Sequence, residues 1–205
     1  MIAIVNYGMG NLGSIKNMLR KVGVDSVITS DPEIIFKASK IILPGVGAFD
    51  TGMNQLKQME LIEVLNEKAL IQKVPILGVC LGVQLMTKGS EEGTLPGLSW
   101  FDAQTKSFNF DTIPGKFTLP NMGWLDVALA KPTKLFDNMY QEPRFYFVHS
   151  YHLESNNQQN VSMTANYGYQ YAVGLEQDNI IGVQFHPEKS HKFGIRLYEN
   201  FIKHF

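Results

Sequence analysis

Short apolar runs alternate with amphipathic stretches through the first half of the chain. The apolar runs predict strands at 2–5, 24–28, 40–43 and 74–79. Helical spacing is found at 12–22, from Asp31-Pro32 onward, at 53–71 and from about Leu81. Strands of uniformly apolar residues that alternate with helices indicate a parallel sheet covered on both faces, with ligand sites at the carboxyl ends of its strands.

The second half of the chain has a different pattern of residues. From Gly89 to Gly123, glycines and prolines interrupt short strand-like pieces, which predicts hairpins and excursions from the main sheet. Further strands are predicted at 144–151, 161–165, 171–175 and 180–185, with a closing helix from about His191. Because no repeat or linker interrupts this order, we expect one α/β domain over residues 1–205.

Composition excludes several classes of protein. Eighteen Lys and Arg residues against 19 Asp and Glu residues leave a net charge of −1, which gives no electrostatic basis for binding nucleic acid or an anionic membrane. The single cysteine excludes an internal disulfide framework and a multi-thiolate zinc site. No run is long enough to span a bilayer, and the apolar start is too short for a signal-peptide core. We therefore expect a soluble, cytoplasmic protein without a metal or cofactor.

The lone cysteine lies in a pattern typical of a nucleophile. Cys80 follows an apolar strand, precedes a helix, and has Gly78 and Gly82 two residues to either side. A nucleophile elbow needs small flanking residues because its turn is tight. The following helix N-terminus favours the thiolate, and the amide of Leu81 would face an oxyanion formed at the sulfur. The alternative is a small buried apolar residue, which leaves the paired glycines unexplained.

A base for this thiol is predicted in the late segment His186-Pro187-Glu188. Proline biases His186 toward an extended conformation, in which residues two apart face the same side. Glu188 would then orient the imidazole of His186, as catalysis by a thiol nucleophile requires. The alternative is a strand end with a surface carboxylate.

A third candidate is the glycine-rich segment from Pro44 to Phe49, at the end of a predicted strand. Glycines let main-chain amides approach a ligand closely. An amide near Val46 or Gly47 could complete an oxyanion hole with that of Leu81. An ordinary Pro-Gly turn explains the same residues.

Together these motifs resemble those of class I glutamine amidotransferases. The stretches 7–12, 44–49, 147–151 and 184–190 further resemble the glutaminase subunit of imidazole glycerol phosphate synthase, and the similarity covers the whole chain. The resemblance implies a three-layer α/β fold with a mostly parallel central sheet and hairpin excursions. It also implies an enzyme that hydrolyses glutamine and passes the ammonia to a (β/α)₈ cyclase subunit in histidine biosynthesis, as a heterodimer.

The same resemblance assigns roles to residues. Cys80 would form a glutamyl thioester, His186 would carry the proton, and Glu188 would orient His186. Gln84 and the main chain at Ser150 and Tyr151 would hold glutamine, and Asn11 and Lys189 would lie near the partner. Because ammonia transfer needs a sealed contact, the free chain is expected to be a poor or gated glutaminase.

The chain departs from the pattern of this subunit at a few positions. Asn6 replaces a usual Asp, Asn121 and Leu125 replace the His and Asn of a His-Met-Gly-Trp-Asn stretch, and Ser99 replaces a Gly. None of these residues belongs to the predicted catalytic triad of Cys80, His186 and Glu188, but each could alter partner contacts. An alternative is therefore a paralogous subunit that supplies ammonia to an amidine-forming synthase in surface-sugar biosynthesis.

Two other classes of function remain open at this stage. The stretch Gly8-Met-Gly10-Asn-Leu-Gly13 follows a strand and opens a helix, and Asp31 follows the next strand, which matches a dinucleotide-binding fingerprint. That interpretation does not account for Cys80 and His186. A catalytically silent binding domain is disfavoured by the intact triad. His149 and His152 are three apart on a predicted strand and face opposite sides, which disfavours a shared metal ion.

Overall fold

Five parallel strands form the centre of the fold in a computed structural model that describes residues 1–205. Their order is β2-β1-β3-β4-β12, and each neighbouring pair runs parallel. The strands are β1 (Ile2–Val5), β2 (Ser26–Thr29), β3 (Lys40–Leu43), β4 (Ile76–Val79) and β12 (Ile180–Val183). This confirms the predicted parallel sheet and brings the carboxyl ends of β4 and β12 side by side.

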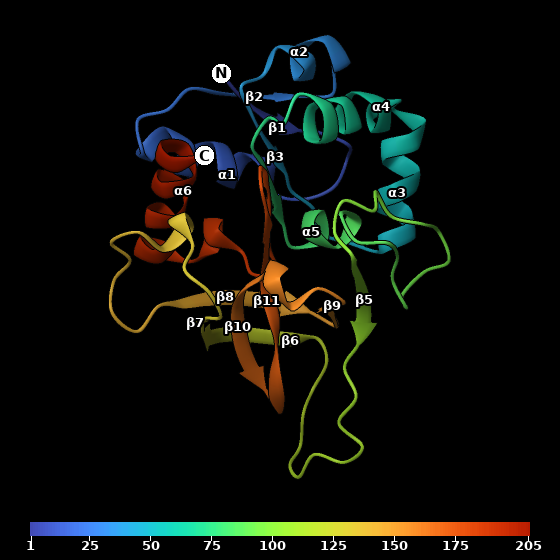
Figure 1. The fold of residues 1–205 in the computed structure, drawn as a ribbon, viewed down its shortest axis with the longest axis vertical. Helices are drawn as coiled ribbons and strands as arrows, with labels where there is room; N and C mark the ends of the chain where they lie inside the picture. Colours follow the sequence, from blue (N-terminus) through green and yellow to red (C-terminus); the bar gives the residue numbers. More distant parts are fainter.

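Helices cover both faces of this sheet, as the sequence predicted (Figure 1). One side carries α1 (Leu12–Lys21) and α6 (His191–His204). The other carries α3 (Phe49–Gln58), α4 (Leu61–Asn66) and α5 (Leu81–Leu85), and α2 (Pro32–Lys37) lies near β2. Ile2 and Ile4 belong to the core under α1 and α6, whereas Ala3 and Val5 belong to the core under α3 and α4. Alternate residues of one apolar strand thus contribute to two separate cores.

Antiparallel strands extend the sheet beyond β12. These are β10 (Val161–Tyr167) and β11 (Tyr169–Gln177), with β7 (Ala128–Leu129) beside β10, and β5 (Ala103–Ser107) and β9 (Tyr151–Ser155) joined to β11. A separate two-stranded sheet pairs β6 (Asn121–Asp126) with β8 (Arg144–His149). The connecting helical turns are η1 (Glu67–Ile71), η2 (Lys134–Phe136), η3 (Gln158–Asn160) and η4 (Pro187–Lys189). These strands form the lower half of Figure 1 and are the predicted hairpin excursions.

Five predicted elements differ from the structure. The strand predicted at 144–151 is interrupted at Ser150, which separates β8 from β9. The helix predicted at 53–71 starts earlier, at Phe49, and is broken at Glu60, whose backbone is left-handed (φ 56°). The strands predicted at 24–28 and 74–79 begin two residues later, and the strand predicted at 180–185 ends at Val183. Apolar periodicity does not register such breaks, because the side chains on either side remain buried.

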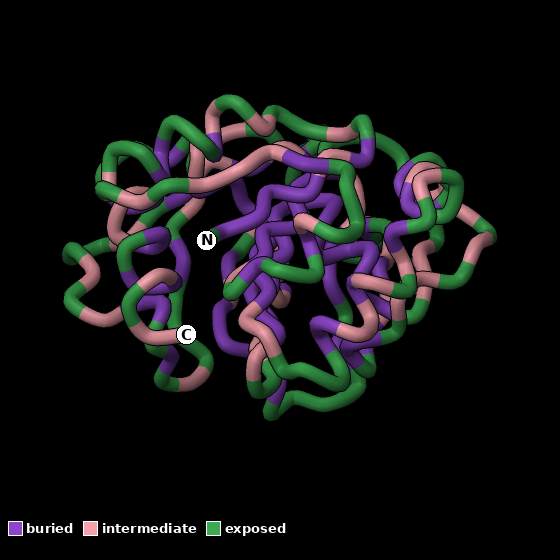
Figure 2. Tube along the Cα trace, turned by 90° about the horizontal axis from the view of Figure 1, so that it is seen from above, coloured by how far each residue is buried: buried purple, intermediate pink, exposed green.

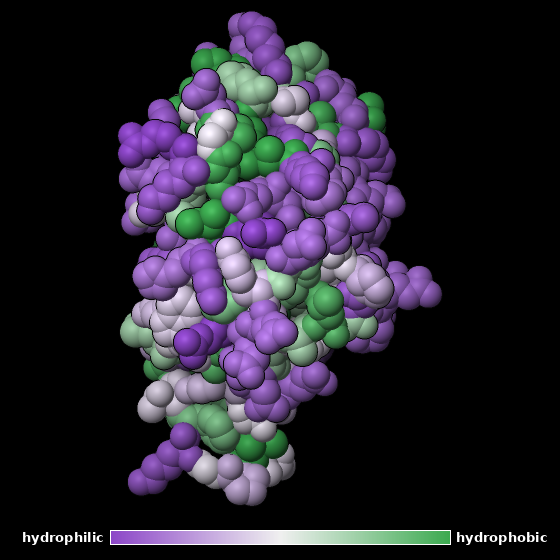
Figure 3. All heavy atoms as spheres, turned by 90° about the vertical axis from the view of Figure 1, so that its left-hand side faces the viewer, coloured by the Kyte–Doolittle hydropathy of each residue, from purple (hydrophilic) through white to green (hydrophobic).

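Burial follows the same plan. Buried segments run through the middle of the chain trace and exposed segments form its rim (Figure 2). The side of the molecule drawn in Figure 3 is mostly hydrophilic, with apolar residues in small groups. None of the helices has the length and apolar character needed to cross a bilayer.

Candidate active site

The turn between β4 and α5 presents Cys80 in a strained backbone conformation. Cys80 has φ 53° and ψ −111°, and its amide donates to the Val183 carbonyl at 2.8 Å. A Cβ on Gly82 would lie 1.8 Å from the Leu43 carbonyl oxygen, and one on Gly78 would lie 2.7 Å from the Met86 sulfur. The tight turn that the flanking glycines predicted is therefore present, and larger residues would not fit.

His186 and Glu188 emerge beside Cys80 because β12 pairs with β4, with Val183 opposite Val79. The His186 backbone is extended, and its Nδ1 lies 2.7 Å from Glu188 Oε1. Both side chains are almost completely buried, at 1% and 4% exposure. The predicted pairing of residues two apart is thus found, and Nδ1–H donates to the carboxylate. The other nitrogen of the His186 ring, Nε2, is buried and has no hydrogen-bond partner.

Two acidic neighbours set the pKa of His186. Burial lowers the pKa of the imidazole, but the Cys80 sulfur and then the Glu188 carboxylate raise it more, to about 10. The ring is therefore cationic near neutral pH because these two acids lie beside it. A protonated imidazole next to a cysteine sulfur is an arrangement that cysteine nucleophiles use.

A small pocket of about 170 Å³ opens above the sulfur of Cys80. It brings together seven of the predicted site residues from three separate segments, namely Val46, Gly47, Cys80, Leu81, Gln84, Ser150 and Tyr151. His186 and Glu188 do not line it. The pocket also contains residues that were not predicted as site residues, including Glu92, Pro120, Val148 and His149.

The amide of Gln84 is held in one orientation at the wall of this pocket. Its Nε2 donates to Gln184 Oε1 at 3.0 Å and to the Tyr151 carbonyl at 3.4 Å. Gln184, which is fully buried, also has its Nε2 3.8 Å from the Cys80 sulfur. Sequence reasoning missed Gln184, although it precedes His186 by two positions and so faces the same side of the chain.

Glu92 is a second residue that sequence reasoning missed. Its Oε2 accepts from the Phe49 amide at 2.9 Å, at the start of α3. Asp50 holds the same loop by accepting from the amides of Thr94 and Leu95, and these bonds lower the pKa of Asp50. No local pattern marks Glu92, because the pocket is formed by chain segments far apart in sequence.

The predicted oxyanion donors are not all free in this conformation. The Leu81 amide donates to the Gly45 carbonyl at 3.2 Å, and the buried Tyr7 hydroxyl donates to the Pro44 carbonyl at 2.6 Å. Val46 and Gly47 are exposed at the pocket. The Leu81 amide can reach an oxyanion only after the Gly45 carbonyl moves away.

Packing accounts for the glycine-rich turn that resembled a dinucleotide fingerprint. A Cβ on Gly10 would lie 3.3 Å from Gly45 Cα, so this turn supports the segment beside the pocket. Asn11 caps α1 by accepting from the Ser14 amide, and Asp31 caps α2 by accepting from the Glu33 amide at 2.8 Å. Asp31, the acid that matched the dinucleotide-binding fingerprint, therefore caps a helix.

The two residues predicted near a partner, Asn11 and Lys189, are both exposed. Lys189 Nζ lies 5.5 Å from the centre of the Tyr146 ring, which packs against Trp124 at 6.1 Å. Trp124 also stacks on His191 at 5.6 Å and is 40% exposed. Met122, two residues before it on β6, is exposed as well. Apolar side chains of this size at the surface are typical of interaction faces.

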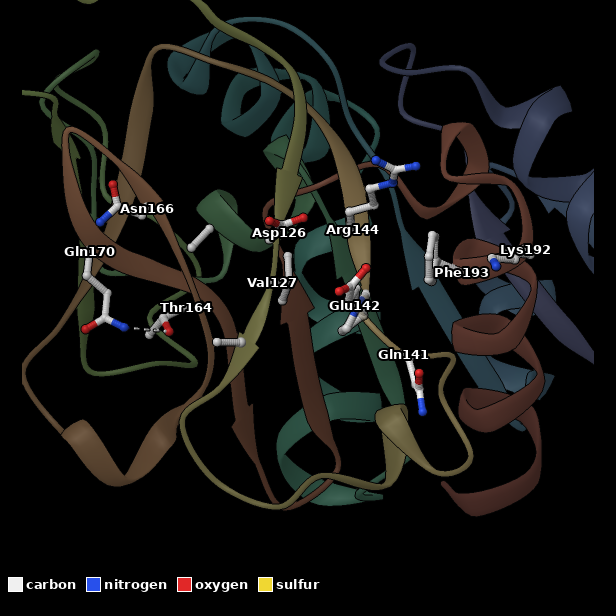
Figure 4. Close-up of a pocket in the computed structure, with 13 residues that line it drawn as sticks. Asp126, Val127, Gln141, Glu142, Arg144, Thr164, Asn166, Gln170, Lys192 and Phe193 are labelled. Atoms are coloured by element: carbon white, nitrogen blue, oxygen red, sulfur yellow. Dashed lines mark hydrogen bonds between the residues drawn. The ribbon is translucent and has the colours of Figure 1, made fainter.

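A larger hollow lies elsewhere in the molecule. It measures about 720 Å³ and is lined by residues of β6, β8, β10 and the start of α6, among them Asp126, Glu142, Arg144 and Lys192 (Figure 4). It holds no nucleophile and no paired base, so its size alone does not make it the reaction site.

Comparison with known proteins places the chain in a family. The family model for glutamine amidotransferase class-I matches residues 3–205.

The chain belongs to the class I glutamine amidotransferases.

Its relatives and structural neighbours agree with this membership. The chain is 53% identical over 203 residues to imidazole glycerol phosphate synthase subunit HisH 2 of Methanococcus maripaludis, which covers 99% of both chains. It is 41% identical to the subunit of the same name from Pseudomonas aeruginosa, again over 99% of each. A crystal structure of a glutamine amidotransferase superposes with a TM-score of 0.75 at 16% identity, covering 99% of this chain and 98% of that one. The glutaminase domain of Trypanosoma brucei CTPS with bound acivicin has a TM-score of 0.61 at 16% identity, covering 98% and 93%. These two structures confirm the amidotransferase fold.

Proposed function

We propose that the chain acts as one domain that hydrolyses glutamine to glutamate and ammonia through Cys80, His186 and Glu188. The observation that carries this proposal is the imidazole of His186, held between a carboxylate and the sulfur at the base of a small pocket. The family membership gives the substrate class, and the site supplies a nucleophile, a proton carrier and an orienting acid.

The chemistry has two halves. The Cys80 thiolate attacks the carbon of the glutamine carboxamide, and the negative charge passes to the carboxamide oxygen. His186 gives its proton to the nitrogen as the C–N bond breaks, which releases ammonia and leaves a glutamyl thioester. His186, now neutral, removes a proton from water, whose oxygen attacks the thioester. The C–S bond then breaks to give glutamate and the thiolate.

The pocket holds glutamine through complementary charges and dipoles. Both N–H donors of Gln84 are engaged within the protein, so only its Oε1 is left to accept from the substrate α-ammonium group. The Glu92 carboxylate is the acid that lines the same pocket and pairs with this cation. Main-chain groups at Ser150 and Tyr151 complete the pocket wall, as the resemblance implied.

The glutaminase activity is gated because the Leu81 amide is already hydrogen-bonded within the protein. The oxyanion needs two donors, Leu81 and an amide at Val46 or Gly47, and Leu81 donates to Gly45 instead. Rotation of the Gly45 carbonyl frees this donor. The isolated chain is therefore a slow glutaminase, and contact of a partner with the exposed Val46–Gly47 segment speeds it.

The names of the relatives point to the partner. Subunits named as parts of imidazole glycerol phosphate synthase are 53% and 41% identical over nearly the whole chain. We propose that this chain pairs as a heterodimer with a (β/α)₈ cyclase subunit in the cytoplasm and supplies ammonia for histidine biosynthesis. Asn11, Lys189 and the exposed Met122 and Trp124 form the docking face. Asn6 keeps a turn that an Asp would also make, because its side-chain oxygen accepts from the Gly8 amide.

The test measures glutamate release by the chain alone and with each candidate synthase from the same genome. We expect slow turnover alone and strong activation by the cyclase subunit, with acivicin attached to Cys80 in the mass spectrum. Activation by an amidine-forming sugar synthase instead would move the chain to surface-sugar biosynthesis. An absence of both turnover and labelling with every partner would contradict the proposed glutaminase.

A further inference from the structure

A buried polar network adjoins the pocket through His149, which is one of the residues that line it. His149 ends β8, and its Nδ1 lies 2.7 Å from the Tyr151 carbonyl oxygen. That carbonyl also accepts from Gln84 Nε2, so a single oxygen connects His149 to the side chain placed on glutamine. The contact spans Ser150, the residue at which the predicted strand is interrupted.

The network assigns the protons of His149. A carbonyl oxygen only accepts, so Nδ1 carries a hydrogen. Burial lowers the pKa of His149 to about 4, which leaves the ring neutral near pH 7 and makes Nε2 an acceptor. Two donors meet it at 3.1 Å each, Asn121 Nδ2 and the Tyr171 hydroxyl. Asn121 Nδ2 also lies 3.2 Å from the Tyr171 oxygen, which closes a ring of three buried side chains.

We propose that Tyr171 and Asn121, acting through His149, are positioning residues that hold the Tyr151 carbonyl where it fixes the Gln84 amide for glutamine. This rests on the proposed glutaminase function. If the Tyr151 carbonyl turned away, Gln84 Nε2 would lose one of its two hydrogen-bond acceptors. The Gln84 Oε1 would then no longer be directed at the substrate. The role also gives Asn121, a departure from the usual pattern, a specific task, since its amide donates to both partners.

The chain offers a matched control in the same hairpin. Tyr169, two residues before Tyr171 on β11, has its hydroxyl 3.1 Å from His152 Nε2. The other ring nitrogen of His152 lies 3.2 Å from the Leu153 carbonyl, and Leu153 does not line the pocket above Cys80. Both tyrosines pack on Phe108 within the same aromatic cluster. The two pairs differ in the carbonyl that the histidine reaches, and the hydroxyl of Tyr169, which is less buried than Tyr171, also accepts from the Asn109 amide.

The experiment compares Tyr171→Phe with Tyr169→Phe in the complex that activates the wild type. Active sites are titrated with acivicin, so that kcat is expressed per competent site. Loss of one buried hydrogen bond in Tyr171→Phe is expected to raise the KM for glutamine about three- to tenfold, with kcat changed less than about twofold. Tyr169→Phe is expected to keep both constants.

A second pair of variants tests His149 itself. In His149→Asn the side-chain amide nitrogen occupies the place of Nδ1 and keeps a donor for the Tyr151 carbonyl, whereas His149→Leu has none. We expect the KM of the Asn variant to lie between those of the wild type and the Leu variant.

Equal KM values for the two tyrosine variants, or a loss of titratable sites with unchanged KM, would overturn the positioning role and leave a structural one. Those outcomes require an active wild type. An inactive wild type in every complex would instead remove the proposed function together with this inference.

Discussion

Two histidines lie beside the same pocket, and near neutral pH one is cationic whereas the other is neutral. His186 sits at the end of the parallel sheet between Cys80 and Glu188, and its pKa is raised to about 10. His149 sits in the antiparallel half among Asn121, Tyr171 and the Tyr151 carbonyl, and its pKa is lowered to about 4. Burial lowers the pKa of both. The acidic neighbours Cys80 and Glu188 outweigh burial at His186, whereas His149 has only neutral hydrogen-bond partners.

The contrast separates two tasks. In the proposed mechanism the parallel half supplies the reacting groups, because the carboxyl ends of β4 and β12 bring Cys80 and His186 together. The antiparallel half then supplies the wall that holds the substrate. One imidazole must carry a proton, and the other must keep its ring neutral to receive donors at Nε2.

The largest effect is expected from Cys80→Ala. Glutamine hydrolysis should fall by a factor of about 10³ or more, since removing a nucleophile removes the covalent route. The pKa of His186 should also fall, because the sulfur is the first of the two groups that raise it, while that of His149 should stay low. Glutamate release and NMR titration of the ring protons measure these changes. Normal partner binding serves as the control, and substantial remaining turnover would show that Cys80 is not the nucleophile.

A smaller loss is expected when the proton carrier or its orienting acid is changed. His186→Ala should slow thioester formation about 10²- to 10⁴-fold. Glu188→Gln should cost less, about 10- to 100-fold, since an orienting acid contributes less than the base itself. Rapid-quench measurement of the acyl-enzyme tests both. Negligible effects from both variants would remove the triad assignment.

Changing the acid in the pocket is expected to affect binding rather than chemistry. Glu92→Gln keeps an oxygen for the Phe49 amide but loses the charge opposite the substrate ammonium. The KM for glutamine should rise about tenfold with little change in kcat. Glu91→Gln is the matched control, because Glu91 bonds to Lys106 and the Ser107 amide. A similar KM change in both variants would mean that Glu92 does not contact glutamine.

The smallest expected effect is on the free energy of unfolding. The two histidines change it with pH in opposite directions. Keeping His149 neutral contributes stability that is complete above about pH 6.5 and is lost as the pH falls toward 4. Keeping His186 protonated contributes stability that is complete below 6.5 and is lost as the pH rises toward 10. Urea unfolding measures this effect. As the pH falls from 6.5 toward 4, the free energy of unfolding should fall by up to roughly 3 kcal/mol less in His149→Asn than in the wild type. An unchanged acid-side slope would mean that His149 is protonated in the fold.

Much of this architecture is predictable from local pattern. The strands at 2–5 and 40–43 match the structure residue for residue, because each contains a short apolar run that ends at a polar or proline residue. The Cys80 elbow and the pairing of His186 with Glu188 follow from spacings of two residues, which an extended backbone or a tight turn converts directly into geometry.

The sequence by itself therefore determined the parallel sheet, the tight turn at Cys80 and the pairing of His186 with Glu188, because each depends on residues a few positions apart. Only the tertiary structure decided the break at Ser150, the place of Glu92, the engagement of the Leu81 amide by Gly45 and the charges of the two histidines. Each of these depends on groups that only folding brings together, or on their burial from water. Desolvation and hydrogen bonding act through space, so no local pattern of residues records them.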